Sequence, residues 1–533
     1  MCRSLSGLLC VLFVSLGCWS SGAALTVSIK DAVDFTLRHN PGVKIEKEKL
    51  EESGGQAQEA SGRFDWTIEI KDIWEKESDE LSPAEKLFLF KIQGARANVP
   101  DILNWEGSLY EIGISRELRS GVTITPELAG TDVWDNLVGG SPANRPVPGV
   151  KISVPLLRGF GSSVAGADEL AARSNLKAAS ALYAYNVSLR VYQTIAAYWD
   201  CLAALKDYQT AGEMKKTAED IAGVIERLVR GGQMRPSVLH QVEGALAERK
   251  MELVKARGHL SQAEQELGFR MGLTPEGLKD APLPRGHFPT VLDWSGPRIE
   301  SLKSKLAEEA LKRRGDLLSA RQNTHTQEAL LRKAENGLLP RLDLQSRVSF
   351  TSLQESSSAD RFFSAYGQDY TGPNFYVQLN LEIPLENNFA RGELHRRQAL
   401  SSGARLRSVQ LNSRVASDVT VALTAFESSI SEYEQAGRVA ENYERAVDDQ
   451  VRLVKEIQGN ITDLITMENR YFQGRLDEIE AQRRYAIALA DLRLVSGTLM
   501  TTGGAVLKFD ADAISRPPFI YGENGDKPGG GSQ

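Results

Sequence analysis

Two glycines, Gly159 and Gly161, follow a strand-like segment and precede a long helical one. A glycine-rich turn between a strand and a helix is the phosphate-binding element of dinucleotide-binding folds. Here the third glycine is not at the required spacing, and the helix that follows is far too long for a compact β-α-β unit. The pair therefore indicates a turn from strand to helix, and we expect no cofactor.

The histidines and acidic residues are the other side chains that suggest chemistry. No histidine falls at metal-ligand spacing with a cysteine or a second histidine. The sequence also lacks a serine nucleophile elbow and a P-loop, and its acids are best explained as solvated helix faces. We therefore expect neither a metal site nor an enzyme. The histidines are His39, His240, His259, His287, His325 and His395.

The first 24 residues are typical of an export signal. Arg3 supplies the positive charge, residues 8–16 the apolar run, and residues 22–24 the small residues before cleavage. The whole chain carries a net charge of −7, and loss of Arg3 makes the mature chain one unit more acidic. With no basic cluster, nucleic acid is a poor partner. Three of the four cysteines lie in the signal, so Cys201 has no partner for an internal disulfide.

Cys18 allows a second interpretation of the signal. Residues 15–18 resemble the lipid-attachment box of bacterial lipoproteins, in which a small residue precedes the acylated cysteine. The leucine that this box normally contains stands at a different place here. Lipidation of Cys18 therefore stays open beside the favoured interpretation, cleavage after Ala24.

The mature chain contains the same pattern twice. A strand-like segment with a Pro-Leu motif contains Pro155 in the first copy and Pro384 in the second, at an offset of 229, and a long Ala-rich helical segment follows each motif. Upstream, residues 37–43 align with residues 311–317 at an offset of 274. The first copy thus carries 45 extra residues (274 − 229) before its Pro-Leu motif. Such a repeat fixes the architecture before any single residue does.

The repeat divides the chain into five parts. We expect a signal peptide at 1–24, a first repeat at 25–275, a linker at 276–297, a second repeat at 298–500, and a partly disordered C-terminal tail at 501–533.

Helices dominate both repeats. The stretch 163–230 has no proline, and at ~1.5 Å per residue it makes a rod on the order of 100 Å long. Each long helix is followed, after a break at 231–237 or 459–463, by a shorter one that runs back antiparallel, and Ser237 and Thr462 or Asp463 are expected to cap the returning helices. The expected helices are 27–39, 42–62, 163–230, 236–272, 298–337, 391–457 and 463–499.

Four strand-like segments lie at the other ends of the helical hairpins. Residues 64–71, 150–156, 341–350 and 375–383 alternate apolar with polar side chains. This alternation is typical of a barrel strand with one face toward lipid and one toward water. No stretch after the signal approaches the ~20 apolar residues of a membrane-spanning helix, so any membrane crossing would use strands.

In this order, the motifs resemble the TolC-type outer membrane efflux and secretion channels, from about Val27 to Leu499. The motifs that carry the resemblance are the doubled repeat with its Pro-Leu sites, residues 29–33 with 40–43, and Tyr198-Trp199.

The resemblance implies an α+β membrane protein in which a duplicated strand and long-helix repeat builds a trimeric β-barrel continued by an α-helical coiled-coil barrel. Each chain of the homotrimer would give four strands to a 12-stranded barrel in the outer membrane and helices to a periplasmic tunnel. The expected function is a passive exit duct of a tripartite efflux pump or a type I secretion system. The implied partners are a periplasmic adaptor, an inner membrane pump and outer membrane lipid.

The same resemblance assigns roles to residues. Asp463 follows Gly459 by four residues where six is usual, so the second tip departs from the family pattern. At the tips, Asp463 and Glu468 are the candidate acids of the aperture, where they would favour cations. The implied strand-to-helix swivel comprises Pro155, Gly159, Gly161, Pro384 and Gly392. The implied adaptor-binding tips comprise Gly231, Gly232, Arg235, Ser237, Gly459, Thr462 and Asp463.

Two alternatives remain at this point. The 45 extra residues contain a hairpin pattern over 108–126 that either lengthens an extracellular loop or adds two strands per chain and makes an 18-stranded barrel. We favour the loop, because a 12-helix tunnel joins more naturally to twelve strands. The competing function is a periplasmic or surface coiled-coil scaffold without channel activity.

Overall fold

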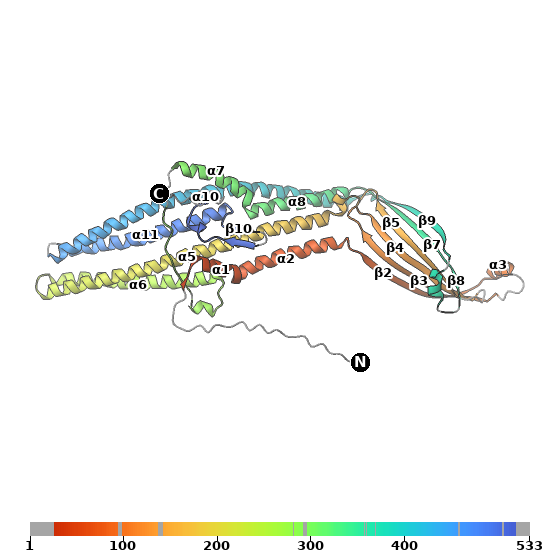
Figure 1. Cartoon of the computed structure of the whole chain (residues 1–533), viewed down its shortest axis with the longest axis horizontal. Helices are drawn as coiled ribbons and strands as arrows, with labels where there is room; N and C mark the ends of the chain where they lie inside the picture. Colours follow the sequence, from red (N-terminus) through yellow and green to blue (C-terminus); the bar gives the residue numbers. More distant parts are fainter. Residues whose placement is uncertain are drawn as a thin grey trace, which may run out of the picture.

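The chain is long and narrow, with helices over most of its length and one large sheet at the opposite end (Figure 1). The expected signal peptide with Cys18, and the end of the C-terminal tail, lie outside the described residues. The structure is a computed structural model, and it describes residues 26–518 apart from 94–98, 137–141, 281, 292–295, 357, 359, 368, 457–458 and 504–505.

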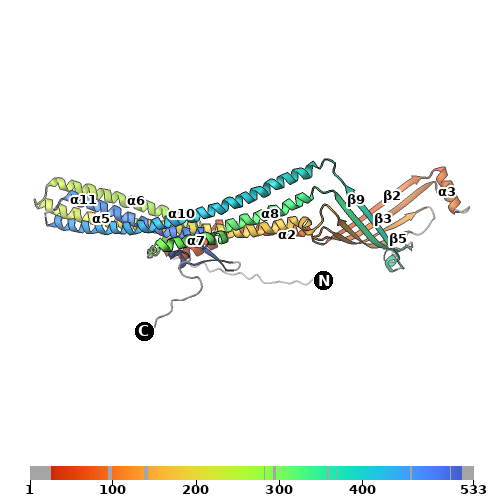
Figure 2. The ribbon, with the colours of Figure 1, turned by 90° about the horizontal axis from the view of Figure 1, so that it is seen from above.

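Two helical hairpins form the part of the molecule farthest from the sheet, and they point the same way (Figures 1 and 2). Their residues form continuous helices because periodic apolar side chains pack on one side and no proline interrupts the backbone ladder. The first hairpin joins α5 (Ala167–Arg230) to α6 (Pro236–Met271), and the second joins α10 (Asn388–Lys455) to α11 (Ile461–Val495).

No described helix combines the length and the apolar composition that crossing a membrane requires.

A broken helix precedes the strands in each repeat: α1 (Ile29–His39) with α2 (Pro41–Gly62), and α7 (Gly296–Arg313) with α8 (Gly315–Asn336). The predicted single helix 298–337 is therefore two helices. The breaks fall at Asn40 and Arg314, which are related by the predicted offset of 274.

Different side chains stabilise the two breaks. The Asn40 side chain accepts from the amide of Gly42 at 2.7 Å and donates to the carbonyl of Arg270 at 2.6 Å. The Arg314 guanidinium is buried and donates to Asp316 and, at 2.8 Å, to Asp418 on α10. Both repeats therefore break the helix at the equivalent position, but different side chains stabilise the two breaks.

The sheet holds six long antiparallel strands in the order β2-β3-β4-β5-β7-β9, with the short β8 (Gln354–Glu355) beside β5. The strands are β2 (Thr67–Glu80), β3 (Ile102–Glu117), β4 (Thr123–Asp135), β5 (Ala143–Pro155), β7 (Arg341–Thr351) and β9 (Thr371–Glu382).

The expectation that the extra residues form an extracellular loop is wrong. They form β3 and β4, which lie between β2 and β5, so each chain contributes six strands to the sheet. The ladder between β3 and β4 has one gap, between the pairs Gly113↔Glu127 and Arg116↔Ile124. Pro126 lies in this gap and has no amide to donate, which explains the interruption.

The two faces of the sheet differ in polarity because side chains alternate along every strand. On one face Val150 lies opposite Val348, and Leu344 is opposite Val154. The other face is polar. On it, Arg347 contacts Glu127 at 2.5 Å as an ion pair. The predicted strand alternation therefore gives one apolar and one polar surface, as a membrane barrel needs.

Smaller elements connect these parts. The helix α3 lies at the far tip of the β2-β3 hairpin, and a hairpin of β10 and β11 follows α11. They are α3 (Pro83–Gln93), α4 (Ser162–Ala165), α9 (Arg361–Ser364), β1 (Thr26–Val27), β6 (Leu283–Pro284), β10 (Met500–Gly503), β11 (Val506–Phe509) and three short 3₁₀ turns, η1 (Gly277–Asp280), η2 (Ala365–Gly367) and η3 (Ala513–Ser515).

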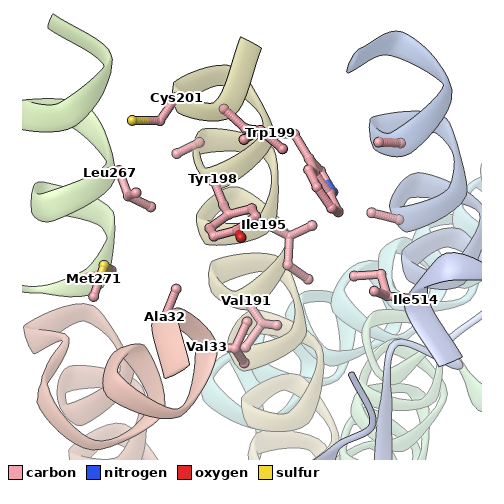
Figure 3. Packing of buried hydrophobic residues seen from close by; sticks show 14 of the residues in the cluster. Ala32, Val33, Val191, Ile195, Tyr198, Trp199, Cys201, Leu267, Met271 and Ile514 are labelled. Atoms are coloured by element: carbon pink, nitrogen blue, oxygen red, sulfur yellow. The ribbon is translucent and has the colours of Figure 1, made fainter. Parts of the chain in front are cut away.

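The main core lies where α1, α5, α6 and α11 meet (Figure 3). Val191 and Ile195 of α5 are fully buried, and Leu267 of α6 and Val33 of α1 pack against the same cluster. Tyr198 is buried as well, and its hydroxyl donates to the carbonyl of Arg285 at 2.6 Å, so burial leaves this phenol with a partner.

Gly315 provides a test of the packing between α8 and α5. A Cβ at Gly315 would lie 2.1 Å from the carbonyl oxygen of Ala181, so the helices approach too closely for any side chain. We expect Gly315→Ala to destabilise the protein by about 1–3 kcal/mol, the usual cost of overpacking. Circular dichroism during thermal unfolding in detergent measures this as a lower midpoint.

The matched control is Gly54→Ala, because Gly54 also lies within a helix but has open space around it. This control should keep or raise the midpoint, since alanine favours helix over glycine by about 1 kcal/mol. Equal midpoints for both variants would contradict the close approach at Gly315.

Candidate functional site

The first strand-to-helix junction follows β5, which ends at Pro155. Gly159 and Gly161 have φ angles of 93° and 96°, in the left-handed region that favours glycine. The amide of Gly159 donates to the side chain of Asn336 at 2.7 Å, which fixes the turn against the end of α8. The two glycines that suggested a phosphate loop thus turn the chain from sheet to helix.

The second junction uses different residues. Pro384 lies between the end of β9 and the start of α10, but Gly392 lies inside α10 and not at the turn. The left-handed residue here is Asn387, with a φ of 50°, and its side chain donates to the carbonyl of Leu338 at 3.2 Å. Asparagine tolerates this conformation better than most residues. The sequence did not single out Asn387, because at the offset of 229 it stands opposite Arg158 and its residue type does not reveal a left-handed conformation.

A cleft of 640 Å³ lies beside both junctions. Arg158 and Lys333 line it, and Lys333 pairs with Asp168 at 2.5 Å. Close by, Phe389 is 90% and Leu385 is 97% exposed. Apolar side chains with such exposure at one place are typical of a surface that another molecule covers.

The first hairpin tip turns on Gly231 and Gly232. Gly232 has a φ of 70°, and the amide of Gly231 donates to the carbonyl of Arg227 at 2.9 Å, which closes the end of α5. The next helix begins after Arg235, whose side chain makes no capping hydrogen bond, and Ser237 lies inside α6. The prediction that Ser237 caps α6 is wrong, because Pro236 already occupies the first helical position.

The second tip turns between Gly459 and the start of α11. The side chain of Asn460 accepts from the amide of Thr462 at 3.0 Å, so Asn460 caps the helix and the predicted cap at Thr462 or Asp463 is wrong. Asp463 is exposed in the first turn, where its negative charge is favourable to the helix dipole.

A small apolar core joins the two tips within one chain. Ile225 of α5 and Val242 of α6 pack with residues of the second hairpin. Side chains in this cluster are almost completely removed from water, so the tips are held together by burial of apolar surface. The residues of the second hairpin are Val454, Ile461 and Leu464.

Between the tips and the sheet, the buried side chain of Arg249 connects α6 with α11. Arg249 donates to the side chain of Asn469 and lies over the ring of Phe472, with 4.7 Å to the ring centroid. Glu468 is 8% exposed, and its burial raises the pKa of the carboxyl while the Arg249 charge opposes that rise. Of the two candidate aperture acids, only Asp463 is therefore exposed in the chain described.

A second acid, Asp207 of α5, is half-buried close to α11. Burial, with the nearby Glu480 carboxylate, raises the pKa of Asp207 to about 6, and Arg483 opposes this rise. One carboxylate oxygen of Asp207 has no hydrogen-bond partner. Arg483 instead donates to Asp200 at 2.6 Å and to Glu480 at 2.7 Å. The two hairpins thus meet through charged groups as well as apolar ones.

The fold is that of solved outer membrane channels. The chain matches the Campylobacter jejuni CmeC outer membrane channel with a TM-score of 0.61 and 13% identity over 93% of this chain and 94% of that one. The match to the outer membrane protein VceC of Vibrio cholerae has a TM-score of 0.61 and 13% identity over 88% and 96%. The match to the Neisseria gonorrhoeae MtrE outer membrane channel has a TM-score of 0.58 and 16% identity over 90% of this chain and 93% of that one.

Residues 306–498 match the family model described as outer membrane efflux protein. No curated protein matches the chain by sequence. The predicted fold class is therefore confirmed, and the match over residues 306–498 agrees with the predicted resemblance. The outer membrane location and the roles of individual residues stay predictions.

Asp207 makes the stability of the helical part depend on pH. Its pKa is 3.8 in the unfolded chain and about 6 in the folded one, so the folded state binds the proton more tightly. The wild-type protein should lose stability at this site as pH rises from about 4 to about 6, by at most about 3 kcal/mol. Asp207→Asn removes this loss.

We therefore expect the thermal midpoint of Asp207→Asn, relative to that of the wild type, to increase as pH rises from 4 to 7. The control is Asp220→Asn, because Asp220 lies on the same helix and is exposed. A constant difference between Asp207→Asn and wild type across this range would contradict the assignment.

Proposed function

We propose that this chain, an outer membrane efflux protein by the domain in its second repeat and an outer membrane channel by its fold, is the passive exit duct of an export machine. The observation that carries the proposal is that the two-faced sheet continues directly into the long helical hairpins. A sheet with one apolar and one polar face turns, through two defined junctions, into helical hairpins long enough to reach far beyond a membrane (Figure 2). Such a chain moves substrate without chemistry of its own.

The same continuity weighs against a coiled-coil scaffold. A scaffold requires only the helical stripes, whereas this chain also builds a six-stranded sheet whose faces separate by polarity. The outer membrane efflux domain and the channel folds of the similar structures favour the conduit as well.

The homotrimer is part of the proposal. Six strands leave a sheet with two open edges, and an open edge cannot face lipid because its amides and carbonyls would lack partners. Further copies must supply those partners. Three copies is the number that the family resemblance implies, and the exposed Leu385 and Phe389 would then lie at contacts between copies or with lipid.

The hairpin tips would receive the periplasmic adaptor and the inner membrane pump, in either an efflux or a type I secretion system. Support comes from their position farthest from the sheet, their glycine turns and the exposed Asp463. The proposed contact residues are Gly231, Gly232, Arg235, Ser237, Gly459, Thr462 and Asp463. Dilation of the tips would require the packed helices there to shift, a change of population that partner binding drives.

Planar-bilayer recording tests the conduit directly. The purified oligomer should give discrete openings, and its currents should favour cations because exposed acids such as Asp463 repel anions. Asp463→Asn should reduce the ratio of cation to anion permeability. The control Glu59→Gln changes an exposed acid on α2, away from the tips, and should leave the ratio unchanged. An oligomer that never conducts would support the scaffold.

Export in cells tests the tip assignment. Gly459→Ala should reduce adaptor-dependent export severalfold, because an added Cβ would lie 2.7 Å from the backbone nitrogen of Val454 and force the turn to change shape. The trimer should still assemble, since the sheet is untouched, and a denaturing gel without heating measures this. Loss of the trimer would give Gly459 a structural role instead.

A further inference from the structure

The two edge strands of the sheet are β2 and β9, and each has a backbone edge that can pair with a strand of another copy. Every residue of both strands is exposed, and along their outer edges the backbone finds no neighbouring strand among the described residues. The apolar face continues to these edges through Ile68 and Ile70 on β2 and Val377 and Leu379 on β9. An edge of this kind within lipid must pair with another strand.

The directions of the two edge strands fit each other. β2 leaves the helical part after α2, and β9 returns to it before α10, so the strands run oppositely. When two copies stand side by side, β9 of one copy and β2 of the next are therefore antiparallel. Because the β2 edge and the β9 edge differ, each copy pairs through β2 with one neighbour and through β9 with the other. Such a head-to-tail contact can close a ring.

The added β3-β4 hairpin is built into the junction and not appended to it. Arg119, in the turn that faces the helices, donates two hydrogen bonds to Glu169 at 2.7 and 2.8 Å, and Glu169 is 4% exposed. The carbonyl of Ser120 accepts from the amide of Gly161 at 2.9 Å. A Cβ at Gly121 would lie 2.4 Å from the carbonyl oxygen of Gly159. The hairpin turn thus rests on the glycine turn that starts the long helix.

Ring sizes are compatible with all six strands in the wall. Eighteen strands about 4.8 Å apart and tilted by about 40° make a ring about 110 Å around. Twelve helices about 9 Å apart, four from each of three copies, also make a ring about 110 Å around. Twelve strands with the same tilt would give only about 75 Å. Equal numbers of strands and helices therefore do not by themselves give rings of equal circumference.

We propose that β9 of each copy pairs with β2 of the next and that three copies close an eighteen-stranded barrel. The number of copies rests on the proposed function, whereas the six strands per copy rest on the sheet itself. The barrel is then about one and a half times as wide as a twelve-stranded one, because diameter grows with strand number. Its membrane section would be wide enough for an aqueous channel, so the hairpin tips and not the barrel would limit passage.

Cysteine pairs test the edge contact. Ile70→Cys is combined in turn with Val377→Cys, Leu379→Cys and Leu381→Cys, all on the apolar face, and the protein is oxidised in isolated outer membranes. At least one pair should link chains at least tenfold more than Ile70→Cys with Gln378→Cys, whose second cysteine lies on the polar face. Equal linking for all combinations, or none for any, would overturn the β2-β9 contact. Cys201 is buried and serves as background.

Single cysteines test whether the added hairpin lies in the wall. In intact membranes, Glu111→Cys on the polar face should react with a membrane-impermeant maleimide, and its neighbour Ile112→Cys on the apolar face should be protected at least tenfold. The same contrast is expected between Thr125→Cys and Ile124→Cys on β4. Equal labelling within each pair would place the hairpin in water as a loop and overturn the eighteen-stranded barrel.

Export measured on the same variants separates this inference from the proposed function. Failed crosslinks and equal labelling with normal export would refute the barrel and leave the conduit standing. The expected crosslinks and protection without export or conductance would refute the conduit and leave the barrel standing.

Discussion

A β-sheet in a membrane cannot end at an open edge, and this constraint determines most of what the chain must do. Each unpaired amide or carbonyl in lipid lacks the partner that water would provide. The six strands cover only part of a closed wall, and their edges, β2 and β9, are exposed along their whole lengths. In the proposed barrel, further copies of the chain would supply the backbone hydrogen bonds that one sheet lacks at its edges. The duplication gives each copy paired strands and paired helical hairpins that can join neighbours on both sides.

In the proposed channel, the two junctions connect the barrel in the membrane to the helical tunnel. Strands twist and tilt, helices pack at larger spacings, and the chain must change from one to the other within a few residues. Left-handed backbone conformations at Gly159, Gly161 and Asn387 make that change. The amide of Gly159 donates to Asn336, and Asn387 donates to the carbonyl of Leu338, so both turns are tied to neighbouring elements. Arg119, in the turn between β3 and β4, donates to the buried Glu169 of α5, so the extra hairpin is held at the same junction. Strain or loss of contact there would uncouple barrel from tunnel.

Much of this architecture could be predicted from the sequence, because long periodic segments are decided locally. The range 163–230 and the structure's α5 differ by only a few residues, since no proline competes with helix there. The position of the added hairpin could not be predicted, because alternation identifies a strand and does not say which neighbour it pairs with. The predicted cap at Ser237 failed because Pro236 takes the first helical position. The predicted cap at Thr462 or Asp463 failed because several capping residues stand close together there and Asn460 makes the capping hydrogen bond. Likewise, the left-handed turn at Asn387 is a matter of φ, which the residue type did not reveal.

The central claim is that several copies of this chain complete one membrane wall and one tunnel around a common bore. Electron microscopy of the purified oligomer in lipid nanodiscs measures this most directly. The account predicts three copies, a barrel wall of eighteen strands in which β3 and β4 lie between β2 and β5, and twelve helices continuing the same bore. A wall of twelve strands with residues 102–135 outside it, or a particle with no closed barrel, would contradict the account.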